Sequence, residues 1–460
     1  MRKISNDNII SLKKILITIF ILSVLFISAS NLSATELLDI ENEYDYFELD
    51  NGLKVMVFTD NSLPVFRFNI IYNLGSIDDP APQSGISLYL NNLVVNGQNI
   101  SDARNIEKII SKTSGFYYGD SGYNYTDRYY SNMKESNLEL VIALEADRMQ
   151  NLLLEPEIIN NSREKVLNRR TDYLNNQFNR AFTELKKATF QNTYLENNYF
   201  GSLEDLENIH QDSLNKHYQK FYHPNNALIS ISGAVDKNQV RKLVERHFAK
   251  IEAVEIEDRN YKPIKQSEEI VNNIYEQNNI PFIIMLYNIV PLDNPDILVI
   301  DLILDILINN QDSRIRKRLQ KEEGLISAAG SYIYGLKSSS FARIYLRAKE
   351  ENDIENILRI FDEELELIFE EGFEEQEFEQ AKLAKIKSFV FAEKNLAEKA
   401  SRMGRDKLLF DNADLKLSHY QYLNKISQKE AVEIAKRYLK VENRARGAIL
   451  SLDEEGEQNE

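Results

Sequence analysis

The sequence of 460 residues contains no cysteine, and it is also low in glycine and proline, with 16 and 9 residues. The lack of cysteine excludes disulfide bonds, thiolate zinc sites, cysteine nucleophiles and a lipidated N-terminal cysteine. A hydrophobic content of 43% is typical of a folded protein rather than a disordered or fibrous one. A chain of this length predicts two or three domains, stabilised by packing alone.

The chain also has fewer basic residues than acidic ones. The chain has 55 Lys and Arg against 72 Asp and Glu, which gives a formal net charge of -17. This balance argues against a nucleic-acid partner, because phosphate binding needs clustered basic residues. A basic peptide or partner surface would be attracted, although solubility is the simplest interpretation of the acidic surface.

Histidine is rare, and its spacing does not favour a metal site. No two histidines have the i, i+4 spacing of a helical zinc motif, and one pair is seven residues apart on what would be one helix face. Isolated histidines are more often surface or capping residues, with a relocated metal site as the alternative. The five are His210, His217, His223, His247 and His419.

The N-terminus carries a targeting signal. Lys13 and Lys14 precede a 13-residue apolar run at 15–27, and small residues follow at 28–30. This pattern predicts a signal peptide over 1–34, cleaved after Ser30 or Ala34, and therefore export to the periplasm or the exterior. The run is short for a membrane span of about 20 residues, although an uncleaved anchor remains the alternative.

The first half alternates predicted strands and helices. Apolar and polar residues alternate on both sides of Asn51-Gly52, which predicts a β-hairpin over 47–57. A strand is predicted at 65–72, and a turn with a buried strand at 223–234. Helical spacing of apolar residues predicts helices at 86–95, 138–154, 157–173 and 237–248.

The second half repeats this logic. It predicts strands at 281–290 and 341–347, a helix at 297–308, and long acidic helices at 351–369 and 374–395. The acidic run from Glu363 to Glu379 is interpreted as a solvated helix face. The predicted organisation is two αβ domains at 44–254 and 269–453, a charged linker at 255–268 and a disordered tail at 454–460.

Several segments together resemble a known family. The first half contains, in order, LDNGLKVMVFTDNSLP, YNLGSIDDPAPQSGISLYLNNL and NLELVIALEADRMQNLLLEP, and the second half adds SRIRKRLQKEEGL. Their order and spacing over about residues 44–452 are similar to those of the insulinase/pitrilysin zinc peptidases. The resemblance implies an α+β fold of two homologous domains, each a mainly antiparallel sheet with helices packed on it, forming a half-clamshell.

The zinc motif of that family is substituted in this chain. Active members carry H-x-x-E-H on a helix, where two imidazoles bind zinc and the Glu activates a water molecule. The matching positions hold Leu88, Asn91 and Asn92, and the distant Glu ligand falls at Asn168 or Arg169. None of these side chains is a good zinc ligand or a general base. The resemblance therefore implies no intact catalytic site and no bound metal.

The family's second domain normally supplies an Arg and a Tyr that hold the substrate carbonyl. The matching positions hold Gln320 and Ser327, so this pair is substituted as well. Gln320 brings a dipole where a cation is usual. Arg316, Arg318, Tyr332 and Tyr334 lie close by in the sequence as shifted substitutes.

A tyrosine-rich segment at 115–130 falls where the family's substrate-binding edge strand is expected. Peptide addition to a sheet edge uses backbone hydrogen bonds and does not need the metal. Tyr117, Tyr118, Tyr123 and Tyr125 are therefore candidates for lining a peptide groove. The alternative is that they pack on the sheet, as strand aromatics usually do.

These observations predict a noncatalytic subunit that pairs with an active insulinase-family homologue, with an extended peptide as a further partner. One alternative is a stand-alone peptide-binding or chaperone-like protein of the cell envelope. Another is a zinc-dependent endopeptidase with a relocated active site. No stable membrane insertion is expected once the signal is cleaved.

Overall fold

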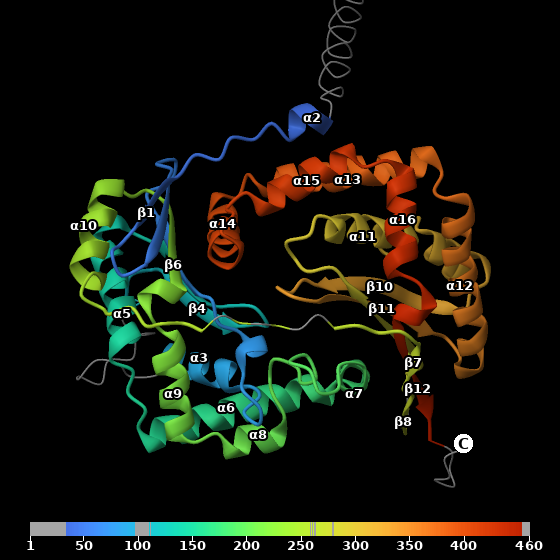
Figure 1. Ribbon diagram of the computed structural model, residues 1–460, viewed down its shortest axis with the longest axis horizontal. Helices are drawn as coiled ribbons and strands as arrows, with labels where there is room; N and C mark the ends of the chain where they lie inside the picture. The colour runs from blue at the N-terminus through green and yellow to red at the C-terminus, as the bar shows by residue number, and fades with distance from the viewer. Residues whose placement is uncertain are drawn as a thin grey trace, which may run out of the picture.

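The computed structural model describes residues 34–96, 110, 112–257, 259, 261, 264–277 and 280–452 (Figure 1). Apart from Ala34, the predicted signal peptide lies outside the described residues, as does the predicted tail at 454–460. Within the described ranges, no helix combines the length and the apolar character needed to cross a membrane.

The first half is built on a sheet with strand order β1-β2-β6-β3-β5-β4. Strands β2 and β6 pair in parallel, and the other neighbours are antiparallel. The predicted hairpin is formed by β1 and β2, and Gly52 between them has a φ of +81°, which glycine adopts without strain. The strands are β1 (Asp45–Glu48), β2 (Lys54–Thr59), β3 (Phe66–Tyr72), β4 (Phe116–Ser121), β5 (Thr126–Met133) and β6 (Ala227–Gly233).

Except for α7 (Gln177–Thr189), the helices of the first half pack on one face of this sheet and form a common core with it. The helix predicted at 237–248 has those bounds in the structure, whereas the helix predicted at 138–154 ends earlier, at Gln150. The helices are α3 (Ile86–Asn96), α5 (Leu138–Gln150), α6 (Pro156–Asn175), α7 (Gln177–Thr189), α8 (Leu203–Asn208), α9 (Gln211–Phe221) and α10 (Lys237–Phe248).

The second half has its own sheet, with strand order β10-β11-β9-β12-β7, and β8 also pairs with β12. The strands are β7 (Ile270–Val271), β8 (Ile274–Glu276), β9 (Phe282–Ile289), β10 (Ile326–Tyr334), β11 (Ser340–Ala348) and β12 (Arg444–Ser451). Two sheets with packed helices confirm the predicted α+β architecture of similar halves.

The predicted helix at 297–308 is α11 (Asp296–Leu304) continued by a π-helical turn (Asp305–Asn309), and a second π-helical turn spans Arg316–Glu322. The remaining helices are α2 (Ala34–Leu37), α12 (Ile354–Glu371), α13 (Glu375–Ala392), α14 (Leu396–Phe410), α15 (Leu415–Lys425) and α16 (Gln428–Tyr438).

One helix of each half packs against the sheet of the other half. Helix α14, which lies between the halves in Figure 1, packs across β6, β3 and β2 and buries Met56 and Phe58. A side chain on Gly404 of α14 would meet Leu228 at 3.0 Å, so the helix approaches the sheet closely. Conversely, Phe182 and Leu185 of α7 pack against the sheet of the second half. Because both faces of β2 are covered, its buried residues run almost continuously instead of alternating.

Candidate functional site

Helix α3 carries the residues that match the zinc motif. Leu88 lies in the core of the first half, and Asn91 is buried with its Oδ1 unpaired among the described residues. Asn92 accepts a hydrogen bond from the Ser162 Oγ of α6 at 2.8 Å. This face of α3 therefore presents an aliphatic group and two amides, which are poor groups for binding zinc.

Helix α6 carries the two positions that match the distant glutamate. Asn168 is exposed, whereas Arg169 reaches Asp120 on β4, with its Nη1 3.2 Å from Oδ1. The guanidinium also lies 5.5 Å from the centre of the Phe200 ring. Burial lowers the pKa of Arg169, but Asp120 outweighs it and the net shift is upward. A permanent positive charge at a predicted metal-ligand position repels a divalent cation.

Gln320 and Ser327, which match the carbonyl-binding Arg and Tyr of the family, form hydrogen bonds with nearby backbone groups. Gln320 Nε2 donates to the Ser327 carbonyl at 3.3 Å. Arg316 donates to the carbonyls of Ile308 and Ala329, and Arg318 pairs with Glu363 and Glu364 at 2.6 and 3.0 Å. Both arginines weighed as shifted substitutes are therefore engaged within the second half.

The histidines are dispersed, and no group of three or more potential metal ligands occurs within the part of the chain that the structure describes. His223 and His419 contact the carbonyls of Gln219 and Asp293, and His247 lies 3.3 Å from Glu139. His210 immediately precedes α9.

His217 forms a buried contact that the sequence did not indicate. Its Nε2 lies 2.9 Å from the Ser87 Oγ, which in turn donates to Asp79 at 2.5 Å. Burial lowers the pKa of His217 to about 3, so the imidazole is neutral near pH 7. In a Ser-His-Asp triad the acid orients the histidine, whereas here the serine bridges both groups. Because Ser87 is buried as well, this cluster fixes the start of α3 and does not resemble a nucleophile.

The tyrosine candidates separate onto two faces. Tyr117 points to the helix side, where its ring lies 4.8 Å from Tyr130 and its hydroxyl accepts from Arg148 at 2.8 Å. Tyr118 is exposed on the opposite face and packs on Tyr129 at 5.6 Å. Successive side chains of a β-strand point to opposite faces of the sheet, which explains why these two neighbouring tyrosines lie on different faces. Tyr117 is thus placed in the core, and Tyr118 lies along the edge strand β4.

Tyr123 and Tyr125 line a cavity of 290 Å³ between the halves, which we call the seam pocket. Tyr332 and Tyr334, at the end of β10, line it from the second half. Asn124 closes one side by donating to the Gly335 carbonyl at 2.7 Å. The structure thus brings two of the sequence-predicted tyrosines together with two that were weighed as substitutes for the carbonyl-binding residues.

A buried charge cluster next to β4 was not predicted. Glu145 on α5 binds Arg128 at 2.7 Å and Arg148 at 2.6 Å, and all three side chains are fully buried. Tyr130 also donates to Glu145 at 2.5 Å. Burial would raise the pKa of Glu145, but the two arginines lower it to about 2. The signal available in the sequence was a Glu and an Arg three residues apart within an otherwise apolar helix face.

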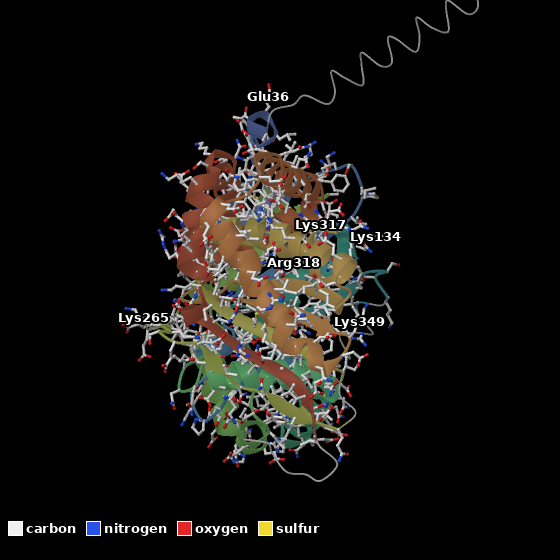
Figure 2. The ribbon with its side chains drawn as sticks, turned by 90° about the vertical axis from the view of Figure 1, so that its right-hand side faces the viewer. Glu36, Lys134, Lys265, Lys317, Arg318 and Lys349 are labelled. Carbon is white, nitrogen blue, oxygen red and sulfur yellow. The ribbon has the colours of Figure 1, made fainter. Side chains whose placement is uncertain are left out.

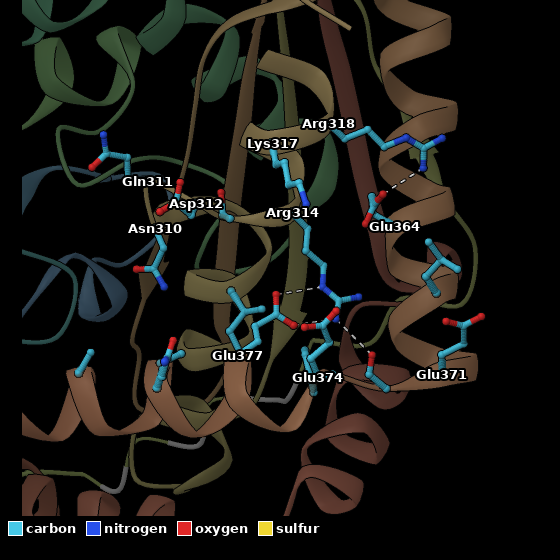
Figure 3. A pocket seen from close by; sticks show the side chains of 18 of the residues that line it. Asn310, Gln311, Asp312, Arg314, Lys317, Arg318, Glu364, Glu371, Glu374 and Glu377 are labelled. Carbon is cyan, nitrogen blue, oxygen red and sulfur yellow. Dashed lines mark hydrogen bonds and ion pairs between the residues drawn. The ribbon is translucent and has the colours of Figure 1, made fainter. Parts of the chain in front are cut away.

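A cavity of 800 Å³ lies in the second half beside α12 and α13. Arg314 pairs with Glu377 across it at 2.7 Å, and Arg318 pairs with Glu364 (Figure 3). Figure 2 shows Lys317 and Arg318 on the face at the right-hand side of Figure 1. The acidic run was predicted to be a solvated helix face. Two of its residues, Glu364 and Glu377, instead form ion pairs with Arg318 and Arg314.

Two family models match the chain. The model described as insulinase (peptidase family M16) matches residues 56–202, and the model of the peptidase M16 inactive domain matches residues 208–385. An uncharacterized zinc protease of Rickettsia bellii (strain RML369-C) is 22% identical over 374 residues, covering 81% of this chain and 89% of the relative.

Solved structures share the fold. A protease from Helicobacter pylori superposes with a TM-score of 0.82 at 18% identity, over 89% of this chain and 100% of that one. The periplasmic protease PqqL from Escherichia coli gives 0.74 at 16% identity, over 89% of this chain but only 48% of that one. The described fold therefore corresponds to about half of the longer protease.

Proposed function

Because the chain belongs to the insulinase (peptidase M16) family, we propose that it is an exported, noncatalytic subunit that pairs with an active, zinc-binding relative. The observation that carries this proposal is the set of side chains at the motif positions. Leu88 and Asn91 are buried and cannot bind a metal or take a proton, and Arg169 places a cation where a carboxylate ligand is expected.

The fold match to a longer protease supports a pairing function. It spans 48% of the PqqL chain, so one copy corresponds to half of a longer protease. In the proposed complex, the zinc-binding relative would supply the other half, and the two chains would enclose a chamber. The named location of PqqL, the periplasm, also fits the predicted signal peptide.

The edge strand β4 supports a retained ability to bind peptide in that chamber. Phe116 and Tyr118 are exposed on β4, and the strand ends the sheet of the first half. An added peptide strand would be held by backbone hydrogen bonds, which survive loss of the metal.

Pairing is tested by mixing the purified chain with a zinc-binding homologue from the same organism. The homologue carries a substitution of its catalytic glutamate, so that proteolysis does not remove the evidence. We expect size-exclusion chromatography with light scattering to show a 1:1 complex. Separate elution of the two chains at micromolar concentration would contradict pairing and leave the stand-alone peptide-binding protein as the better account.

A further inference from the structure

The seam pocket has the dimensions and lining of a subsite for one side chain. Its 290 Å³ is at the lower limit of the roughly 300–1,000 Å³ usual for small-molecule sites. Besides tyrosines 123, 125, 332 and 334, it is lined by two carboxylates, Asp120 and Asp127, and by no cationic residue among those that the structure describes.

The two carboxylates face each other across neighbouring strands. Asp120 of β4 and Asp127 of β5 are direct register partners, and like charges in this position repel. Arg169 compensates Asp120. The Asp127 carboxylate makes no hydrogen bond or ion pair with any side chain or backbone group that the structure describes, although the residue is partly buried.

Three cations, Arg405, Lys186 and Arg343, lie 5.2–5.4 Å from the ring centres of tyrosines that line the pocket, and none of them forms an ion pair with Asp127 among the described residues. Arg405 lies 5.2 Å from the centre of the Tyr125 ring, and Lys186 donates to the carbonyls of Leu195 and Asn197. Arg343 packs on Phe182 at 4.7 Å. Burial raises the pKa of Asp127 to about 6, and the opposing attraction of Arg405 does not offset it. At pH 7 the pocket therefore holds a negative charge without a direct partner.

We propose that the seam pocket binds the cationic side chain, lysine or arginine, of an extended peptide held between the two halves. The ammonium or guanidinium group would pair with Asp127 and relieve its repulsion from Asp120, while tyrosine hydroxyls accept its remaining hydrogen bonds. This inference rests on the proposed function in one respect, namely that peptide enters the space between the halves.

The position of the pocket suits a peptide on β4. Asp120 lies on the same face of that strand as the exposed Tyr118, two residues away, so a side chain of an added strand can reach the pocket. The net charge of -17 further favours a basic peptide over an acidic one.

The test compares two degenerate libraries of short peptides that differ only at one central position, which is lysine or norleucine. Norleucine keeps the aliphatic stem and lacks the ammonium group. Binding to the purified single chain is measured by calorimetry, without any partner subunit. We expect the lysine library to bind roughly tenfold more tightly. We also expect n-butylammonium chloride to compete more strongly than sodium chloride at equal concentration.

Asp127→Asn should reduce the preference for lysine to within about twofold, because it removes the charge and keeps the shape. Asp172→Asn, an exposed aspartate on α6, is the control with the same net charge and should keep the full preference. Tyr332→Leu, at a side chain that is 58% exposed, should weaken the preference without unfolding the protein.

The outcomes separate this inference from the proposed function. Equal binding of both libraries, or a full preference in Asp127→Asn, would contradict the cationic subsite and leave the peptide-binding chamber intact. Binding of neither library would contradict the subsite and the peptide-binding part of the proposed function together. Pairing with a homologue is measured separately and is unaffected by either result.

Discussion

Replacement of Glu145 by alanine is expected to lower the free energy of unfolding by about 3–5 kcal/mol, because it leaves two buried guanidinium groups without their counter-ion. Glu145 is the carboxylate that binds Arg128 and Arg148, at 2.7 and 2.6 Å. Tyr130 would also lose the acceptor of its hydroxyl. The measurement is denaturant unfolding of both proteins at pH 7.

Glu139→Ala on the same helix is the matched control. Glu139 pairs with Arg246 at 2.7 Å but is half exposed, so its loss should cost at most about 1 kcal/mol. Equal effects of the two substitutions would contradict the account of a buried cluster.

The stability difference between wild type and Glu145→Ala should also depend on pH. The pKa of Glu145 is lowered to about 2 in the folded state. It is near 4.3 in the unfolded chain, so the stabilisation is complete above that value and is lost as the pH falls. The difference should therefore shrink by about 2 kcal/mol between pH 6 and pH 3.

Replacement of Phe182 by alanine is expected to destabilise both halves together, by about 3–5 kcal/mol. Phe182 belongs to α7 of the first half but is buried against the sheet of the second half, stacked on Tyr334 at 5.6 Å. The cavity would therefore open at the junction of the halves. Denaturant unfolding should show one transition, shifted to lower denaturant, with probes placed in either half.

Phe391→Ala provides the control, because the Phe391 side chain is 74% exposed at the end of α13. It should change the free energy of unfolding by less than about 0.5 kcal/mol. Two separate transitions, or a Phe182→Ala effect as small as that of the control, would show that the halves do not depend on α7.

Much of the fold could be predicted from local patterns. The helix at 237–248 has the predicted bounds because its apolar spacing lies within the segment and its cap, Asp236, lies directly before it. The β1-β2 hairpin followed equally from Asn51-Gly52. The positions that match the zinc motif could likewise be located from the sequence, because all of them lie within the single helix α3.

The remaining features depend on residues far apart in the sequence. Met56 and Phe58 of β2 are buried by α14, which lies more than 300 residues later in the chain. The pairing of Arg169 with Asp120 and the assembly of the seam pocket arise in the same way. No single segment contains enough information to predict such contacts.

The most direct test of the central claim, a zinc site that has lost its ligands, is the metal content and cleavage activity of the singly expressed chain. After dialysis against metal-free buffer, we expect far less than one zinc per chain and no peptide cleavage, with or without added zinc. Stoichiometric zinc that survives dialysis, together with cleavage that a chelator abolishes and zinc restores, would contradict the claim.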